Sequence, residues 1–150
     1  MRKLTLTLIS LIFLSPALAQ PTKEPPMTSV SPCPGRKPNC VSTAQKPDEK
    51  FYINPIKLES PEDMEKAWKL LQILPPSFRL SWDMKSEDQM VGIATTKLMK
   101  FKDDVVLKKN REKLTIEMRS ESRFGYSDRG VNRERLENIR SYIKENLQKG

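Results

Sequence analysis

Histidine is missing from this chain of 150 residues. Histidine is the commonest general base near neutral pH and the commonest metal-binding side chain. Its absence therefore excludes a Ser-His-Asp arrangement, a Cys-His pair and any zinc site that uses histidine. Catalysis would have to rest on carboxylates, lysine, tyrosine or the two cysteines. We predict neither a metal site nor a cofactor.

An apolar run long enough to cross a membrane is also missing. The stretch Leu4–Leu14 is apolar apart from two threonines and a serine, whereas a spanning helix needs about 20 apolar residues. It follows Arg2 and Lys3, and Pro16 separates it from the small residues of Ala17-Leu18-Ala19, which together are typical of a cleavable signal peptide. We predict that residues 1–19 are removed, that the protein is exported, and that no transmembrane segment remains.

Cysteine is scarce, with only Cys33 and Cys40 present. Exported proteins meet oxidising conditions, in which a pair with no other partner usually forms a disulfide. Pro34, Gly35 and Pro38 bend the six intervening residues, which helps the two sulfurs to meet. A redox dithiol favours two intervening residues, and a metal site would lack its other ligands. A structural disulfide is therefore the prediction.

Charge of one sign is not dominant, although the chain is basic. Of the 27 lysines and arginines, two precede residue 20, which leaves 25 against 19 acidic residues. A nucleic-acid-binding protein usually has a denser basic stripe with interleaved aromatic residues, so no nucleic-acid partner is predicted. An anionic lipid head group, a glycan or an acidic protein stays open as a partner, beside a basic surface that serves only solubility.

Proline is absent after Pro76, whereas eight of the 12 prolines lie before residue 48. Residues 20–50 therefore read as an extended, largely irregular arm that contains the Cys33–Cys40 loop. Residues 51–150 are sufficient for one small domain.

Helical periodicity appears twice in that domain. Ser60 and Pro61 are typical of a helix start, and Pro75-Pro76 ends the helix. Its apolar stripe is Met64, Ala67, Trp68, Leu71 and Leu74. The last helix has an apolar face of Leu136, Ile139, Ile143 and Leu147.

Four strands are predicted between the helices. Alternation over 78–84 indicates a half-buried strand. Further strands are expected at about 91–97, 104–109 and 114–118, with the turn of a hairpin at Asn110-Arg111-Glu112. Short connections favour antiparallel pairing, so the prediction is an α+β fold in which both helices pack on one face of a four-stranded antiparallel sheet.

The segment between the last strand and the last helix is the candidate functional site. Glycines before a helix allow a tight turn, and free N–H groups there attract anions. Arginine, serine and asparagine add donors for phosphate or carboxylate. The candidate ligand-binding residues are Arg123, Ser127, Asp128, Arg129, Asn132 and Arg133. Structural roles stay open beside this one: Asp128 can cap the helix or meet Arg123, and Arg123 can pair with another carboxylate.

Three segments carry a resemblance to a known family: Pro38-Asn39-Cys40-Val41-Ser42, Phe101–Val105 and Ser120–Arg133. With them, the chain resembles the bacterial and plastid domain-of-unknown-function 1499 family over about Cys33–Leu147, and Tyr52–Ile56 is similar to its cyanobacterial and chloroplast version. The resemblance implies a periplasmic, other extracytoplasmic or thylakoid-lumen location, and it implies no particular activity.

Two classes of function follow. The first, which we favour, is a non-catalytic binding or accessory protein of the cell envelope or thylakoid lumen that recognises an anionic ligand or an envelope protein. The alternative is a small hydrolase that uses carboxylates such as Glu121 and Asp128. Acid–base chemistry by two carboxylates requires them to face each other across a cleft, whereas binding needs only a basic surface.

Overall fold

The centre of the fold is a six-stranded antiparallel sheet, in a computed structural model that describes residues 27–35 and 37–149. The predicted signal peptide lies outside the described residues. The strands are β1 (Cys40–Ser42), β2 (Ile56–Lys57), β3 (Leu80–Lys85), β4 (Gln89–Thr95), β5 (Lys102–Asn110) and β6 (Thr115–Ser122). The helices are α1 (Pro61–Gln72) and α2 (Val131–Leu147), with a 3-10 turn at Pro76–Phe78.

The predicted α+β class is confirmed, but the predicted number of four strands is wrong. The strand order is β1-β6-β5-β4-β3. Strand β2 also pairs with β6, along the same edge as β1 but with the other end of β6. The two additional strands have three and two residues, too few for an alternating pattern to be recognised. They also precede α1, so the domain does not begin with a helix. Cys40–Ser42, which the sequence placed in the proline-rich arm, is buried in the sheet.

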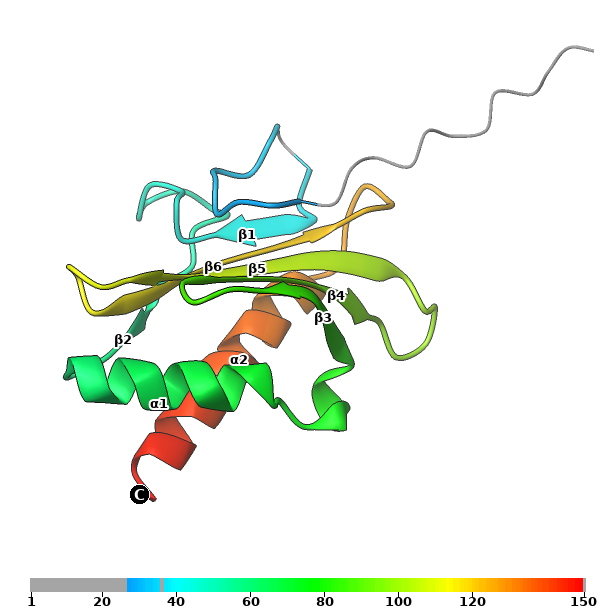
Figure 1. Cartoon of the computed structure of the whole chain (residues 1–150). Helices are drawn as coiled ribbons and strands as arrows, with labels where there is room; N and C mark the ends of the chain where they lie inside the picture. Colours follow the sequence, from blue (N-terminus) through cyan, green and yellow to red (C-terminus); the bar gives the residue numbers. More distant parts are fainter. Residues whose placement is uncertain (1–26, 36, 150) are drawn as a thin grey trace, which may run out of the picture.

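Both helices cover the same face of the sheet (Figure 1). Ser60 lies before α1, and its hydroxyl accepts a hydrogen bond from the Asp63 N–H at 3.1 Å. The first helix buries Met64, Ala67, Trp68 and Leu71, and the second buries Leu136, Ile139 and Ile143. All of these side chains except Met64 form one core with the helix-facing residues of the sheet, among them Val105, Leu107, Ile116 and Met118. The apolar periodicity therefore identified the buried faces of both helices.

The edge strand β3 departs from the predicted alternation. Phe78 belongs to the 3-10 turn rather than to the strand, and a bulge interrupts the pairing of β3 with β4 between Trp82 and Met84. Gly92 lies opposite Trp82. A Cβ atom on Gly92 would come within 2.5 Å of the Ser81 carbonyl oxygen, so the close approach of the two strands requires glycine.

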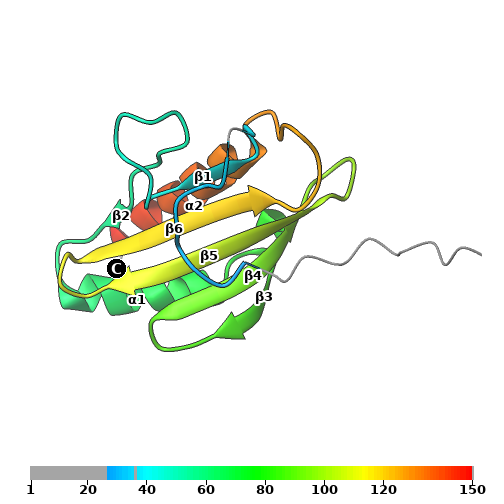
Figure 2. The same ribbon diagram turned by 90° about the horizontal axis from the view of Figure 1, so that it is seen from above.

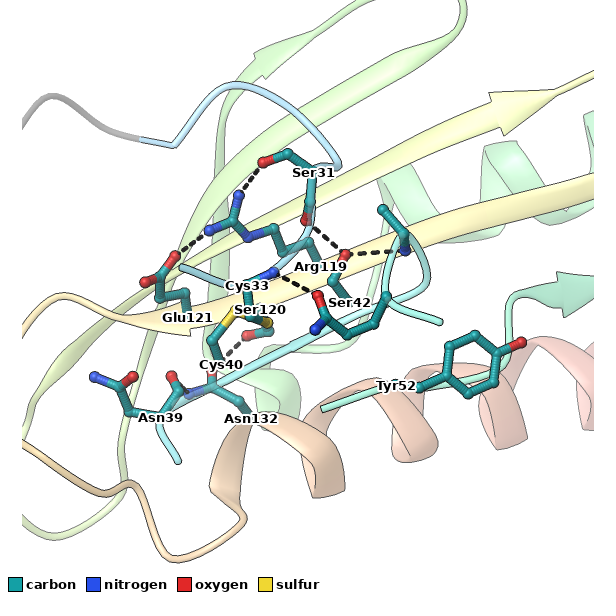
Figure 3. The surroundings of a disulfide bond; sticks show 12 residues. Ser31, Cys33, Asn39, Cys40, Ser42, Tyr52, Arg119, Ser120, Glu121 and Asn132 are labelled. Carbon is teal, nitrogen blue, oxygen red and sulfur yellow. Dashed lines mark hydrogen bonds and ion pairs between the residues drawn. A yellow bond between two sulfur atoms is a disulfide. The ribbon is translucent and has the colours of Figure 1, made fainter. Parts of the chain in front are cut away.

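The arm before β1 crosses the other face of the sheet, above β5 and β6 (Figure 2). Cys33 and Cys40 are joined by a disulfide, as predicted, with their Cα atoms 5.8 Å apart. The Arg119 guanidinium on β6 donates a hydrogen bond to the hydroxyl of Ser31 in the arm (Figure 3). The Ser42 hydroxyl donates to the Ser31 carbonyl at 2.7 Å. The disulfide therefore joins the arm to the edge strand of the sheet.

Removing this disulfide is expected to reduce the free energy of unfolding by about 2 kcal/mol, the low end of the usual range, because it closes a short loop. The Cys33→Ser/Cys40→Ser variant and the reduced wild-type protein should unfold at the same lower urea concentration. Equal unfolding midpoints for the oxidised protein and the double variant would contradict this expectation.

Candidate functional site

The turn from β6 into α2 is held by the carboxylate of Asp128. Its Oδ1 accepts a hydrogen bond from the Gly130 N–H at 2.9 Å, and its Oδ2 accepts one from the Asn132 N–H at 2.8 Å. These contacts satisfy N–H groups that the first turn of a helix leaves free. Gly130 has a φ of 87°, a left-handed conformation that favours glycine. Capping, one of the two structural roles left open for Asp128, is the one that the structure shows.

Arg123 does not contact Asp128, so that alternative is wrong, whereas its other predicted role, pairing with another carboxylate, is confirmed. Its guanidinium instead donates two hydrogen bonds to Asp104 on β5, from Nε at 2.9 Å and from Nη2 at 2.6 Å. The hydrogen bond with Asp104, followed by the charge of that carboxylate, raises the pKa of Arg123 above its usual value. This ion pair fixes the end of β6 to the neighbouring strand.

Asn132 lies at the centre of a buried polar network at the start of α2. Its amide oxygen accepts hydrogen bonds from the Ser120 hydroxyl at 2.5 Å and from Arg135 Nη1 at 2.6 Å. Its amide nitrogen lies within 3.0 Å of the Asn39 carbonyl, the Ser122 hydroxyl and Asp128 Oδ2. Figure 3 shows Asn132 beside Ser120, between the helix and the sheet. Asn132 is thus an internal connection between α2, β6 and the arm.

Arg135 completes this network and was not among the predicted residues. Its Nη2 lies 2.5 Å from Asp103 Oδ2 on β5, and both side chains are buried. A sequence signal existed, because Asn132 and Arg135 share the helical stripe of Leu136, Ile139 and Ile143. Polar residues on a buried stripe indicate a buried polar contact.

The remaining candidates divide between the interior and the surface. Arg133 Nη2 donates to the carbonyls of Lys50 at 3.0 Å and Tyr52 at 2.7 Å. Ser127 and Arg129 are exposed, and the Ser127 hydroxyl accepts a hydrogen bond from the Arg129 N–H at 3.2 Å. Only these two of the six candidates therefore present exposed side chains.

The two carboxylates of the hydrolase alternative each have a separate partner. Glu121 Oε2 lies 2.5 Å from the Nη2 of Arg119, whose side chain is buried beneath the arm (Figure 3). Asp128 uses both carboxylate oxygens to cap α2. Both acids therefore have structural contacts.

A hollow of about 430 Å³ lies beside the start of α2, between the 3-10 turn and the end of β4. We call it the α2 hollow. Its lining includes the cations Arg79, Lys97 and Arg135 and one acid, Glu134. The hydroxyl-bearing residues Ser77, Thr95 and Thr96 also line it. A second hollow, of about 350 Å³, is lined by Arg79, Thr95, Lys102 and Asp83 among others.

The backbone holds the cationic side of the α2 hollow in place. Arg79 has a φ of 51°, and its carbonyl accepts a hydrogen bond from the Thr95 N–H at 3.0 Å. The Thr96 hydroxyl accepts one from the Phe101 N–H at 2.9 Å. Arg79 and Lys97 are exposed, and neither forms an ion pair with another described residue. By contrast, Asp103 offsets the charge of Arg135.

A second charged cluster lies where the β3–β4 and β5–β6 turns meet α1. Both carboxylate oxygens of Glu65 on α1 lie 2.8 Å from the Nζ of Lys109, whose side chain is buried. The Lys109 ammonium also lies 5.0 Å from the centre of the Trp68 ring. Arg111 joins Glu65 to Glu87 and Asp88. The cluster fixes α1 to the sheet turns, which is a structural role.

This cluster predicts a loss of stability in acid. The hydrogen bond from Lys109 is the largest cause that lowers the folded-state pKa of Glu65 below its usual 4.5. The unfolded chain therefore takes up the proton first, so the contribution is complete above pH 4.5 and is lost as the pH falls through the folded-state pKa. Because Glu65 is half-exposed, we expect no more than about 1 kcal/mol. Urea unfolding from pH 7 to pH 3 should show the difference between wild type and Glu65→Gln narrowing below about pH 4.5; a constant difference would contradict it.

Within residues 27–35 and 37–149, no three or more histidine, cysteine, aspartate or glutamate side chains are grouped in a way that could hold a metal ion. None of the helices in this part of the chain has the length and apolar character needed to cross a bilayer.

These features define a small α+β protein with a disulfide-linked edge strand and a basic hollow at the start of its last helix. The chain belongs to the family described as "Protein of unknown function (DUF1499)", whose sequence profile matches residues 29–143. The family resemblance predicted from the motifs is thereby confirmed. No curated protein and no solved structure matched the chain.

Proposed function

We propose that the protein is a non-catalytic binding or accessory protein that holds a small anionic group, such as phosphate or carboxylate, in the α2 hollow. The observation that carries this proposal is the pair of exposed cations, Arg79 and Lys97, in a hollow whose lining has a single acid, Glu134. A planar guanidinium and neighbouring hydroxyl donors suit the oxygens of phosphate or carboxylate.

The α2 hollow is a better candidate for anion binding than the β6–α2 turn itself. In that turn, Arg123 is paired with Asp104, and Arg133 is bonded to two backbone carbonyls. These partners already occupy part of the hydrogen-bonding capacity of each guanidinium, and Asp104 offsets the charge of Arg123. Arg79 and Lys97 would lose no ion pair with a described residue, so binding there costs less.

The arrangement favours binding over hydrolysis by paired carboxylates. Glu134 is the one carboxylate that lines the α2 hollow, and Asp83 is the one that lines the second hollow. A carboxylate-based hydrolase needs one group to act as acid while the other acts as base or nucleophile. Neither of these two hollows places two carboxylates across a bound group.

The proposed place of action is the cell envelope or the thylakoid lumen. The predicted signal peptide of residues 1–19 supports export. The Cys33–Cys40 disulfide suits an oxidising compartment. The intact mass of the protein recovered from its host tests this part of the proposal, since an exported chain should begin at Gln20.

The chain offers a matched pair of variants to test the binding site. Arg79 and Arg129 are both exposed, and both have a left-handed backbone, with φ values of 51° and 54°. Arg79→Gln should weaken the binding of inorganic phosphate about tenfold, since it removes a charge-assisted hydrogen bond. Arg129→Gln should leave the affinity unchanged. Isothermal titration calorimetry with phosphate at fixed ionic strength measures both.

Three other outcomes would contradict the proposal in different ways. A loss of affinity in Arg129→Gln alone would move the site to the β6–α2 turn. Equal affinity in wild type and both variants would show that phosphate binds without the guanidinium of Arg79. No binding of phosphate or acetate by the wild-type chain would remove the α2 hollow as an anion site.

A further inference from the structure

Two loops at one end of the sheet carry an unusual share of the exposed apolar surface. Among the described residues, five of the six exposed large hydrophobic side chains lie in these loops, and the sixth is Ile73. We call the five the apolar tips. They are Leu98, Met99 and Phe101 in the β4–β5 loop, and Phe124 and Tyr126 in the β6–α2 turn, with exposed fractions of 86%, 68%, 42%, 77% and 70%.

The two loops lie next to each other at the end of the sheet where α2 begins (Figures 1 and 2). The ring centres of Phe101 and Phe124 are 6.3 Å apart. The Arg123 N–H donates a hydrogen bond to the Lys102 carbonyl at 3.2 Å, which joins the loops through their backbones. The apolar tips therefore lie on two adjoining loops at one end of the sheet, with Phe101 and Phe124 next to each other, and exposed apolar residues gathered in this way mark an interaction site.

Internal contacts hold the bases of both loops. Arg123, which forms an ion pair with Asp104, directly precedes Phe124 in the chain. Gly125 lies between Phe124 and Tyr126 in the chain, and its carbonyl accepts a hydrogen bond from the Asn39 side-chain amide at 3.0 Å. On the other loop, the Phe101 N–H donates to the Thr96 hydroxyl. These contacts leave the apolar side chains exposed on supported loops.

Positive charge is interleaved with the apolar residues. The β4–β5 loop and the first residue of β5 read Thr96-Lys97-Leu98-Met99-Lys100-Phe101-Lys102, with three lysines and no acidic residue. The next acids in the chain, Asp103 and Asp104, are paired with Arg135 and Arg123. Arg129 adds an exposed cation in the second loop. These lysines and Arg129 therefore give the two loops a positive charge that is complementary to an anionic surface.

This combination points to a lipid surface rather than to a protein groove. Leucine, phenylalanine and tyrosine side chains enter the boundary between head groups and acyl chains favourably. Lysines between them can place their long apolar stems along that boundary while their ammonium groups contact anionic lipid head groups. A protein partner would have to pair three closely spaced lysines with acids and cover the same five tips.

We propose that the apolar tips dock the protein on the surface of an anionic lipid bilayer, with Lys97, Lys100 and Lys102 against the lipid head groups. The proposal goes beyond anion binding in the α2 hollow, with which it shares Lys97. It does not require an anion in that hollow, because the tips alone bring apolar surface to the membrane.

Sedimentation with lipid vesicles tests this proposal on the chain as recovered from its host. Wild-type protein should bind vesicles of phosphatidylcholine and phosphatidylglycerol, and bind pure phosphatidylcholine more weakly. Leu98→Ser/Met99→Ser should reduce binding to the mixed vesicles at least about tenfold, because two apolar side chains no longer leave water. Lys100→Ala should reduce it about fivefold, and only for the anionic vesicles.

Ile73→Ser is the matched control, since Ile73 is a large exposed apolar residue outside the two loops, with an exposed fraction of 73%. It should leave vesicle binding unchanged. Because all the substituted side chains are exposed, urea unfolding should show every variant as stable as wild type. Arg79→Gln should keep most of the vesicle binding even where it loses inorganic phosphate, which separates this proposal from the α2 hollow.

Equal binding by the Leu98→Ser/Met99→Ser and Ile73→Ser variants would overturn the proposal, as would a wild-type chain that binds neither kind of vesicle. A chain that binds no vesicle and forms a dimer, which the double substitution disrupts, would assign the tips to a second copy of the protein and would also overturn it.

Discussion

Replacing Asp103 with alanine should reduce the free energy of unfolding by about 3–5 kcal/mol, the cost of breaking a buried ion pair. Asp103 is 1% exposed and lies 2.5 Å from Arg135 Nη2 between β5 and α2. Without its carboxylate, the buried guanidinium of Arg135 keeps only its contacts with Ser120 and Asn132. A charge held in the interior without its counter-ion is among the most destabilising of single changes.

Asp104 is the matched control for this expectation. It is the next residue of β5, and its partner Arg123 is more exposed than Arg135. Asp104→Ala should therefore cost less, about 1–2 kcal/mol. Urea unfolding of both variants at pH 7 gives the comparison. A cost for Asp103→Ala no larger than that for Asp104→Ala would show that the buried pair is not the stronger contact.

A double substitution distinguishes the effect of the two charges from the effect of the interior volume that the two side chains fill. Asp103→Leu/Arg135→Met removes both charges and leaves apolar side chains in their place. It should recover much of the stability that Asp103→Ala loses, because hydrophobic residues of similar volume commonly replace a buried ion pair without penalty. A double variant as unstable as Asp103→Ala would indicate that shape, rather than charge, is decisive at this position.

The parts of the fold that the sequence predicted are those that depend on local pattern. Ser60 and Pro61 determine the start of α1 through contacts within one turn. The apolar stripes of both helices needed only a period of about 3.6 residues. The Cys33–Cys40 disulfide followed from the scarcity of cysteine and the inferred compartment. None of these inferences required knowledge of which strands are neighbours.

The parts that the sequence did not predict depend on pairing between distant segments. Cys40–Ser42 forms strand β1 because it pairs with the edge of β6 that β5 does not occupy, with Val41 opposite Ser120. Arg123 meets Asp104 because their strands are neighbours in the sheet, 19 residues apart in the chain. The sequence was compatible with Asp128 either capping α2 or contacting Arg123, and in the structure Asp128 caps α2. The pairing and register of distant strands determine which of several possible partners a side chain contacts, and the local sequence pattern does not specify that register.

Replacing Asn132 with alanine should reduce the free energy of unfolding by about 3 kcal/mol, because it leaves several buried polar groups without a partner, each costing about 1–3 kcal/mol. Asn132 is fully buried. It joins the Asn39 carbonyl of the arm to Ser120 of β6, and it contacts Asp128 of the helix cap. A single amide therefore connects three segments that are far apart in the chain.

The charge of this position should matter as much as its hydrogen bonds. Asn132→Asp keeps the shape but places an oxygen where Nδ2 lies 2.7 Å from Asp128 Oδ2 and 3.0 Å from the Asn39 carbonyl. At pH 7 it should be at least as unstable as Asn132→Ala, since two carboxylates would then be adjacent. Protonation of one of them relieves the repulsion, so its deficit relative to wild type should shrink as the pH falls. Asn138→Ala, an exposed position on the same helix, should unfold like wild type. If Asn132→Ala and Asn138→Ala unfold at the same urea concentration, the network around Asn132 does not stabilise the junction of arm, sheet and helix.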